Sequence, residues 1–574
     1  MYIETIPNRN SKPAVLLREG KREGAVVRKK TLLNLTDWPP ERVEALRQLL
    51  AGKKLVPFEE VFAIERSLPH GHVEAALTAV RRLGLERLIA SQPSRERRLV
   101  VAMIVERLIH PASKLATTRL WHDTTLAREL DVEDADEDDL YDALDWLLAR
   151  QAAIERRLAR RHLREGGLVL YDVSSSYYEG RTCPLARRGY SRDGKRGLPI
   201  IVYGVMTAAS GCPVAVDVYP GNTGDPATVA DQADTLRDRF GLERVVLVGD
   251  RGMLTGARIA ELRERPGLGW ISALRTEGVR ALVESGDIQM SLFDQQNLAE
   301  IVSPDYPGER LVVCFNPLLA EDRRRTREEL LAATEADLDK IVREAARRTK
   351  TPMTQKEIAL RAGRVAGARK MAKHLRLTIE DGRFAHERDA ESIQREEALD
   401  GFYVIRTSES AAAMSAPDAV RNYKRLAEVE RAFRTLKSMD LRVRPIRHRT
   451  EDRVRAHIFL CMLAYHVEWH MRRALAPLLF DDEEREESRT TRDPVAPARP
   501  SAAADAKRRA RKTAGEDGLA LQSFETLMIH LGTLCRHICR SRQTPNAPPL
   551  DRLTDPTPLQ EKALELLGTL VPST

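Results

Sequence analysis

The stretch GGLVLYDVSSSYYEG, residues 166–180, decides the fold class, because a glycine pair introduces a short apolar run there. LVLYDVS predicts a buried strand. Two more strand-like runs follow, LPIIVYGVMT (198–207) and CPVAVDVYP (212–220), with the turn residues Ser210-Gly211 between them. RVVLVGD (244–250) and WISALR (270–275) predict a fourth and a fifth strand. The chain therefore contains an α/β domain built on these five strands.

Helical patterns separate the later strands. In residues 221–240 we expect a helix with Asp225 as its N-cap and Pro226 as its first residue, and LTGARIAELRER (254–265) predicts another. An RNase H-like fold has this order of elements: three consecutive strands, a helix, and then alternating strands and helices. We therefore predict an RNase H-like core, with a mixed β-rich insertion and a helical N-terminal region.

Residue patterns and composition in the rest of the sequence predict the other domains of the chain. Residues 276–417 mix strand-like and helical pieces, with a hairpin turn expected at Asp381-Gly382, and indicate an inserted domain. The expected domains are a β-rich arm (1–55), a helical candidate DNA-binding region (56–165), the RNase H-like core (166–275 and 418–479), the insertion (276–417), a disordered linker (480–518) and a helical tail (519–574). For the helices of 56–165, a purely structural bundle remains the alternative.

Composition limits the class of protein. The chain of 574 residues is 42% hydrophobic and 31% charged, which is typical of globular proteins with several domains. Its six cysteines include no CxxC pair, so we expect reduced thiols. No apolar run is long enough to span a bilayer, and the N-terminus has no apolar signal core. We predict a soluble, cytoplasmic protein without a membrane partner.

Positive charge is unevenly distributed. The net charge of +8 is modest, but residues 421–455 carry many arginines and lysines with few opposing carboxylates, and a second cluster spans 507–512. Such local positive fields suit a phosphate backbone. A solvated helix face is the alternative for any single basic run. Aromatic residues make up only 5%, which argues against binding dominated by stacking on single-stranded bases.

Two carboxylates follow buried apolar runs. Asp172 stands at the end of LVLYD and Asp250 at the end of RVVLVGD. An unpaired charge is costly to bury, so packing alone does not explain these positions. On neighbouring strands, the two carboxylates would share a hard divalent cation such as Mg²⁺, which prefers oxygen ligands.

A third carboxylate lies in NYKRLAEVERAFRTLKS, residues 422–438. On an ideal helix, Tyr423, Glu430, Arg434 and Lys437 share one face, because steps of seven residues are nearly two turns. The apolar residues Leu426, Val429, Phe433 and Leu436 form a separate stripe. The helix can thus bury one side and present a carboxylate between cations. An ordinary amphipathic surface helix is the alternative.

Together, YDVSSSYYEG, VGDRGM and the Tyr-x₆-Glu-x₆-Lys helix resemble the three signature blocks of DDE transposases encoded by bacterial insertion sequences. The group with a Tyr-Arg-Glu-Lys signature and a β-rich insertion before the glutamate is the most similar. Asp172 and Asp250 are 78 positions apart, and Asp250 and Glu430 are 180 apart, as an insertion would produce. The resemblance spans residues 1–475. It implies that Asp172, Asp250 and Glu430 are the catalytic metal ligands for Mg²⁺, with Mn²⁺ as a substitute.

The resemblance also implies cleavage of double-stranded DNA at element ends, strand transfer into target DNA, and a dimer or higher oligomer on DNA. Tyr423 and Lys437 would hold phosphates near the cleaved end. The group's signature arginine should stand three residues after the tyrosine, where this chain has Leu426. Either Arg425 or Arg434 replaces it, or that phosphate contact is absent.

Two other functions are compatible with the sequence. An RNase H-like structure-selective nuclease would cut DNA without joining it. A transposase-derived DNA-binding protein without catalysis would keep the basic surfaces but tolerate loss of the carboxylates. A glycosidase built on paired carboxylates has little support, because few aromatics are present to stack on sugars.

Overall fold

The computed structural model describes residues 1–571, apart from residues 10, 54–61, 196, 294–295, 440, 498, 511–517 and 543–545. The chain divides into two units, residues Met1–Leu68 with Cys535–Asp555, and residues Pro69–Leu534 with Pro556–Thr574. The second, larger unit carries the predicted carboxylates. No described helix combines the length and the apolar character needed to cross a membrane.

An eight-stranded mixed sheet runs through the larger unit in the order β10-β11-β14-β9-β8-β5-β6-β7. Its five predicted strands are β5 (Leu168–Tyr177), β6 (Ile200–Ala208), β7 (Pro213–Pro220), β8 (Val245–Val248) and β9 (Leu268–Ala273). β5, β6 and β7 are antiparallel neighbours, whereas β8 pairs parallel to β5 and β9 parallel to β8. The predicted α/β class and RNase H-like strand order are confirmed.

Helices enclose this sheet. α9 (Gln151–His162) and α18 (Glu451–Ala474) pack on β7, and α17 (Leu426–Arg434) packs on β5 and β6. β6 is buried at every residue, which explains why its sequence is a continuous apolar run rather than an alternating one. Between β7 and β8 lie η2 (Asp225–Thr228), α10 (Val229–Asp234) and the π-helical turn η3 (Thr235–Arg239), and α11 (Gly256–Arg263) precedes β9.

The N-terminal helices belong to the same hydrophobic core as the sheet. They are α3 (Gly71–Arg82), α4 (Leu85–Ile89), α5 (Arg95–Ile109), α6 (Lys114–Leu120), η1 (Trp121–Asp123), α7 (Leu126–Glu129), α8 (Glu137–Leu148) and α9. α5 and α8 both pack on α18, and their buried side chains join those of the sheet in one cluster. The helical region predicted for 56–165 is therefore present from Gly71 onward, and it is built into the larger unit rather than forming a separate core. Its first part differs from the prediction, since Phe62–Pro69 is a strand and residues 56–61 lie outside the described residues.

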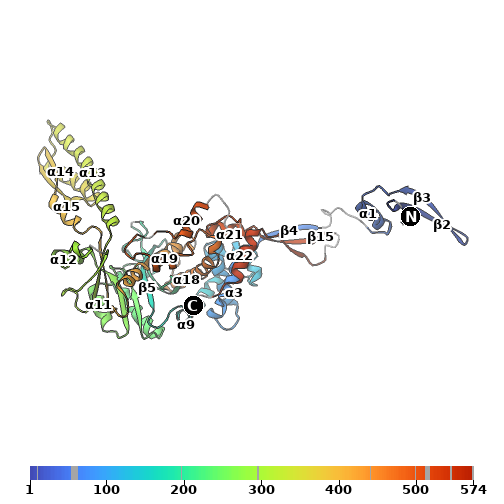
Figure 1. Ribbon diagram of the computed structural model, residues 1–574, viewed down its shortest axis with the longest axis horizontal. Helices are drawn as coiled ribbons and strands as arrows, with labels where there is room; N and C mark the ends of the chain where they lie inside the picture. The colour runs from blue at the N-terminus through green and yellow to red at the C-terminus, as the bar shows by residue number, and fades with distance from the viewer. Residues whose placement is uncertain are drawn as a thin grey trace. The chain divides into compact units, whose positions relative to one another are not determined.

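The insertion between β9 and α16 (Ala416–Lys424) has two parts. β10 (Leu298–Ile301), β11 (Arg310–Phe315) and β14 (Phe402–Thr407) extend the central sheet beyond β9, next to α12 (Thr276–Glu284) and η4 (Met290–Phe293). α13 (Pro317–Arg347), α14 (Gln355–Ala368), η5 (Ala372–His374), β12 (Leu375–Glu380), β13 (Arg383–Arg388) and α15 (Ala390–Glu397) lie together (Figure 1), and a separate core forms among them.

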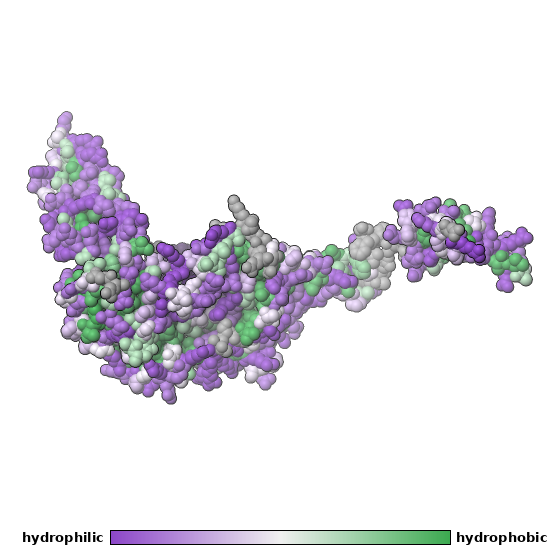
Figure 2. Space-filling model, viewed as in Figure 1, coloured by the Kyte–Doolittle hydropathy of each residue, from purple (hydrophilic) through white to green (hydrophobic). Residues whose placement is uncertain are grey.

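The predicted turn at Asp381-Gly382 joins β12 to β13, with Gly382 at φ +72°. The insertion is mixed, as predicted, but its largest element is the helix α13. The face of α13 and α14 seen in Figure 2 is mainly hydrophilic.

The sequence after residue 479 differs from the prediction. The segment 480–518, predicted as a disordered linker, contains α19 (Arg485–Thr491) and α20 (Ala502–Arg509), because its charged side chains find partners: Arg489 Nη2 lies 2.6 Å from Glu428 Oε1. The helical tail predicted for 519–574 is helical only in part. It contains α21 (Phe524–Gly532), but the strand β15 (Cys535–Ser541) follows, because this segment pairs with strands β16 and β4.

The smaller unit contains two three-stranded sheets. β1 (Tyr2–Ile6), β2 (Ala14–Glu23) and β3 (Val26–Asn34) form the first, followed by α1 (Pro40–Leu50). β4 (Phe62–Pro69), β15 and β16 (Leu550–Leu553) form the second. The larger unit contains two further short helices, η7 (Ala476–Leu478) and α22 (Pro558–Gly568).

Candidate active site

Asp172 and Asp250 follow the paired residues of two neighbouring strands. β5 pairs with β8 in the parallel register Leu168↔Val246 to Leu170↔Val248. That pairing ends two residues before each aspartate, and the two carboxylates are close enough for the charge of Asp250 to act on Asp172. The prediction that Asp172 ends its strand is wrong, since β5 continues to Tyr177 against β6. Asp172 lies instead just beyond the residues of β5 that pair with β8.

The Asp172 carboxyl is in an environment that disfavours its charge. Burial is the main cause, and the nearby charges of Asp250 and Asp225 add to it, so that the pKa of Asp172 rises to about 7. A hydrogen bond from the Val173 backbone N–H to Oδ1, at 2.8 Å, and the charge of Arg192 oppose this rise only in part. A divalent cation between the carboxylates would remove the repulsion.

Tyr423 contacts the second carboxylate, that of Asp250. Its hydroxyl donates to Asp250 Oδ1 at 3.4 Å, and the backbone N–H of Gly252 donates to Asp250 Oδ2 at 3.2 Å. Burial raises the pKa of Tyr423, and the charges of Asp250 and, more weakly, Glu430 raise it further. Tyr423 therefore stays protonated near neutral pH and orients the Asp250 carboxylate.

The helix that carries Glu430 is broken into three pieces rather than continuous. α16 ends at Lys424, α17 runs from Leu426 to Arg434, and the π-helical turn η6 (Thr435–Met439) follows. The predicted apolar stripe holds, because Val429, Phe433 and Leu436 are buried while Leu426 is half-buried against the core. These contacts press α17 onto β5, the strand of Asp172.

The two glutamates of α17 differ sharply. Glu430 is exposed and makes no hydrogen bond or ion pair within the described residues. Glu428 is buried and lies within ion-pair distance of Arg431, Arg485 and Arg489. A carboxylate that is held on a packed helix but left without a partner is suited to bind a ligand from outside the chain.

Lys437 is not exposed beside Glu430, as an ideal helix would predict. It lies in the π-helical turn, and its side chain is buried with Nζ 3.0 Å from Asp193 Oδ1. Arg444 Nη1 lies 2.6 Å from the same Asp193 oxygen. Burial and the charges of Arg444 and Arg192 lower the pKa of Lys437, although Asp193 opposes them. We name Arg192, Lys437 and Arg444 the basic cluster.

The two arginines considered as replacements at the Leu426 position are in different environments. Arg425 is occupied within the protein, since Nη1 donates to the Ala209 carbonyl at 3.1 Å and Nη2 pairs with Glu486. Arg434 is exposed, one helical turn beyond Glu430, and has no ion pair in the described part of the chain. Of the two, Arg434 is the one available to a phosphate.

Sequence reasoning missed three residues of this region, Arg192, Asp193 and Asp225. The expected N-cap role of Asp225 is wrong: the helical turn there is capped by Gly224, and the Asp225 carboxylate pairs with Arg192. Asp193 also accepts from the Tyr177 backbone N–H at 3.1 Å. The run GYSRDGKRG (189–197), with charges placed between glycines, was the signal that could have indicated a loop over the site.

The donor set fits a hard divalent metal. The three candidate ligands are carboxylates, and no cysteine or histidine is among them. Magnesium binds through one or two carboxylates together with water and substrate phosphates. An exposed Glu430 leaves room for such a substrate.

Comparison with known proteins identifies two segments. The family described as "Transposase DDE domain" matches residues 168–467, just over half of the chain, and "IS1634 family transposase, N-terminal domain" matches residues 3–57. No curated protein matches. A solved structure, "Cryo-EM structure of piggyBac transposase synaptic complex with hairpin DNA", covers 80% of this chain and 76% of its own at 9% identity, with a TM-score of 0.33.

Proposed function

The chain belongs to the DDE transposase family, and from this premise we propose that Asp172, Asp250 and Glu430 are the metal-binding triad that cleaves element-end DNA and transfers it into a target. The observation that supports this assignment is that the parallel pairing of β5 and β8 ends two residues before Asp172 and Asp250, whose charges interact. Glu430 is carried by α17, which packs on β5, the strand of Asp172.

The family implies dependence on a divalent metal, and we propose Mg²⁺, with Mn²⁺ as a substitute. Two such ions would activate the attacking water or 3′-hydroxyl and stabilise the leaving oxygen. Asp172 and Asp250 would provide one side of the site and Glu430 the other. Tyr423 holds Asp250 in position through its hydroxyl, and the packing of Val429 and Phe433 holds Glu430.

We propose double-stranded DNA as the partner, with Arg434 and Tyr423 nearest to the scissile phosphate. Lys437 would act through the basic cluster, where Lys437 and Arg444 share the carboxylate of Asp193 while Arg192 pairs with Asp225, so that three cations face two carboxylates and leave positive charge for a DNA phosphate. Arg425 is not retained as a phosphate ligand, because it holds the β6–β7 turn instead. The helical region 56–165 remains a candidate for further DNA contacts. We also propose action in the cytoplasm and as a dimer or higher oligomer on DNA.

A strand-transfer assay tests the proposal. Purified protein, Mg²⁺ and a duplex bearing the element end should yield nicked ends, and adding target DNA should yield joined products. Nicking without joining would assign a structure-selective nuclease instead. Binding without any cleavage in Mg²⁺ or Mn²⁺ would assign a DNA-binding protein derived from a transposase.

Replacing Arg434 with glutamine should weaken binding of element-end DNA about 5- to 10-fold at moderate salt and lower the slope of log K against log salt by about 1. The reason is that Arg434 is an exposed cation next to Glu430, without an ion pair in the described chain. Fluorescence anisotropy over a salt series measures both quantities.

The matched control is Arg431→Gln on the same helix. Arg431 is also exposed, but unlike Arg434 it has an ion pair, with Glu428 at 3.3 Å. Its loss should leave the salt slope unchanged. Equal slopes for the two variants would remove Arg434 from the proposed phosphate contact.

A further inference from the structure

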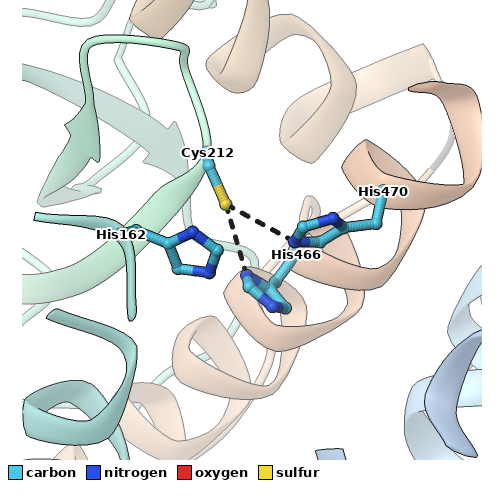
Figure 3. Close-up of side chains that lie close together, drawn as sticks. All are labelled: His162, Cys212, His466 and His470. Carbon is cyan, nitrogen blue, oxygen red and sulfur yellow. Dashed lines mark hydrogen bonds between the residues drawn. The ribbon is translucent and has the colours of Figure 1, made fainter. Parts of the chain in front are cut away.

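Four metal-ligating side chains meet in the larger unit, and none of them belongs to the carboxylate triad. His162 ends α9, Cys212 lies between β6 and β7, and His466 and His470 come from α18 (Figure 3). One possible ligand atom from each lies within 4.8 Å of the others. We propose that His162, Cys212, His466 and His470 bind one structural Zn²⁺ ion.

The spacing of the donor atoms agrees with a tetrahedral zinc site. Cys212 Sγ lies 3.6 Å from His466 Nδ1 and 3.9 Å from His470 Nε2. With Zn–S near 2.3 Å and Zn–N near 2.05 Å, a tetrahedral angle separates sulfur from nitrogen by about 3.6 Å. The three imidazole centres are 4.8 to 5.6 Å apart, so the rings surround one point.

The chemical state of the donors also suits zinc. Cys212, His466 and His470 are buried. A ring nitrogen of each of these two histidines faces the sulfur of Cys212. One thiolate with three imidazoles, and no carboxylate, selects a borderline-soft ion such as Zn²⁺ over Mg²⁺.

Hydrogen bonding alone satisfies this cluster poorly. Cys212 Sγ faces two imidazole nitrogens, at 3.6 Å and 3.9 Å, and a cysteine sulfur is a weak donor and a weak acceptor, so these contacts provide little hydrogen bonding. A zinc ion would bind the sulfur and engage both nitrogens at once.

Two of the four proposed ligands lie close together in the sequence. His466 and His470 are four residues apart and therefore lie on one face of α18, the spacing by which two histidines of a helix bind one zinc ion. Cys212 precedes His466 by 254 residues, and His162 precedes Cys212 by 50. The ion would thus join α9, the β6–β7 turn and α18.

The β6–β7 turn in turn supports the helix of Glu430. Arg425 Nη1 donates to the Ala209 carbonyl at 3.1 Å. Gly211 has φ +87°, and a Cβ there would lie 2.9 Å from Cβ of Glu428, so the turn packs directly on α17. Zinc at Cys212 would fix this turn, and its removal should loosen the support of α17.

The test measures metal in the full-length chain. Protein loaded with Zn²⁺ and dialysed against Mg²⁺ should keep one zinc per chain by mass spectrometry. Co²⁺ in its place should give the visible bands of tetrahedral cobalt and a sulfur-to-cobalt charge-transfer band. A zinc chelator should lower Tm by about 5–10 °C, and Zn²⁺ but not Mg²⁺ should restore it.

Two variants remove the site. Cys212→Ser should abolish the charge-transfer band and retain less than about a tenth of the zinc. If that variant does not fold, His162→Ala is informative, because His162 is only half-buried at the end of α9, and zinc affinity should fall at least about 100-fold.

Two matched controls keep the site. Cys461→Ser removes another buried thiol of α18, whose Sγ lies 3.9 Å from His457 Nε2, and should keep both the zinc and the band. Asp250→Asn should also keep them, which separates this site from the carboxylates. Wild-type protein without the thiolate band, or zinc retained in Cys212→Ser, would overturn the proposal.

Discussion

Glu430→Gln should lower Mg²⁺-dependent cleavage of element-end DNA by about 10³-fold or more while leaving Tm unchanged. The glutamine keeps the size of the side chain but loses the charge that a divalent ion requires. Glu430 is exposed and has no partner in the described residues, so the substitution removes no contact that holds the fold. A nicking assay and a thermal melt, run on the same preparation, measure the two effects.

Glu428→Gln is the control two residues earlier on the same helix. Glu428 is buried and lies 2.6 Å from Arg489 and 3.0 Å from Arg485. Removing its charge breaks the ion pairs that join α17 to α19 and leaves a buried polar group with weaker partners, so this variant should lower Tm. Its cleavage rate, measured well below its Tm, should stay within about 10-fold of wild type. Cleavage by Glu430→Gln at the wild-type rate would exclude Glu430 from the triad.

Asp172→Asn should also abolish cleavage, and it should stabilise the metal-free protein at pH 8. The pKa of Asp172 is raised to about 7 in the folded chain, so its protonated form favours folding. That contribution is fully present below the ordinary aspartate pKa near 4 and is lost as pH rises through 7. Asparagine carries no charge to lose. With a chelator present, the variant should gain about 1–3 kcal/mol over wild type above pH 7.

Thermal melts between pH 5 and pH 8 measure this difference, which should grow up to pH 7 and then level off. Adding Mg²⁺ at pH 8 should raise Tm of the wild type and leave that of Asp172→Asn unchanged. Asp217→Asn on β7 is the control. Burial also raises the pKa of Asp217, but its carboxylate accepts from Gln232 at 3.0 Å and lies outside the triad. That variant should keep both the Mg²⁺ response and cleavage, and a lost Mg²⁺ response there would argue against a triad-specific effect.

Several parts of the molecule could be predicted because their signals are local. The five central strands follow from uninterrupted apolar runs, since a strand covered on both faces excludes polar side chains. The turn at Asp381-Gly382 follows from a glycine that accepts positive φ. The positions of Asp172 and Asp250 after such runs pointed to function, because burying an uncompensated charge is costly.

The wrong predictions concern features whose cause lies elsewhere in the chain. A capping role for Asp225 was a sound local inference, but Arg192, 33 residues away, takes its carboxylate. The segment after residue 479 has a composition typical of disorder, yet Arg485 and Arg489 pair with Glu428, 61 residues before Arg489. Local composition does not record such partners.

The sequence by itself determined the α/β core, the three candidate carboxylates and the helix face with Tyr423 and Glu430, because hydrophobic periodicity and charge placement act over a few residues. Only the tertiary structure decided that the charge of Asp250 acts on Asp172, that Lys437 in the π-helical turn pairs with Asp193, and that Cys212 meets three histidines. Those arrangements depend on strand register and on packing between distant segments, which no short stretch of sequence specifies.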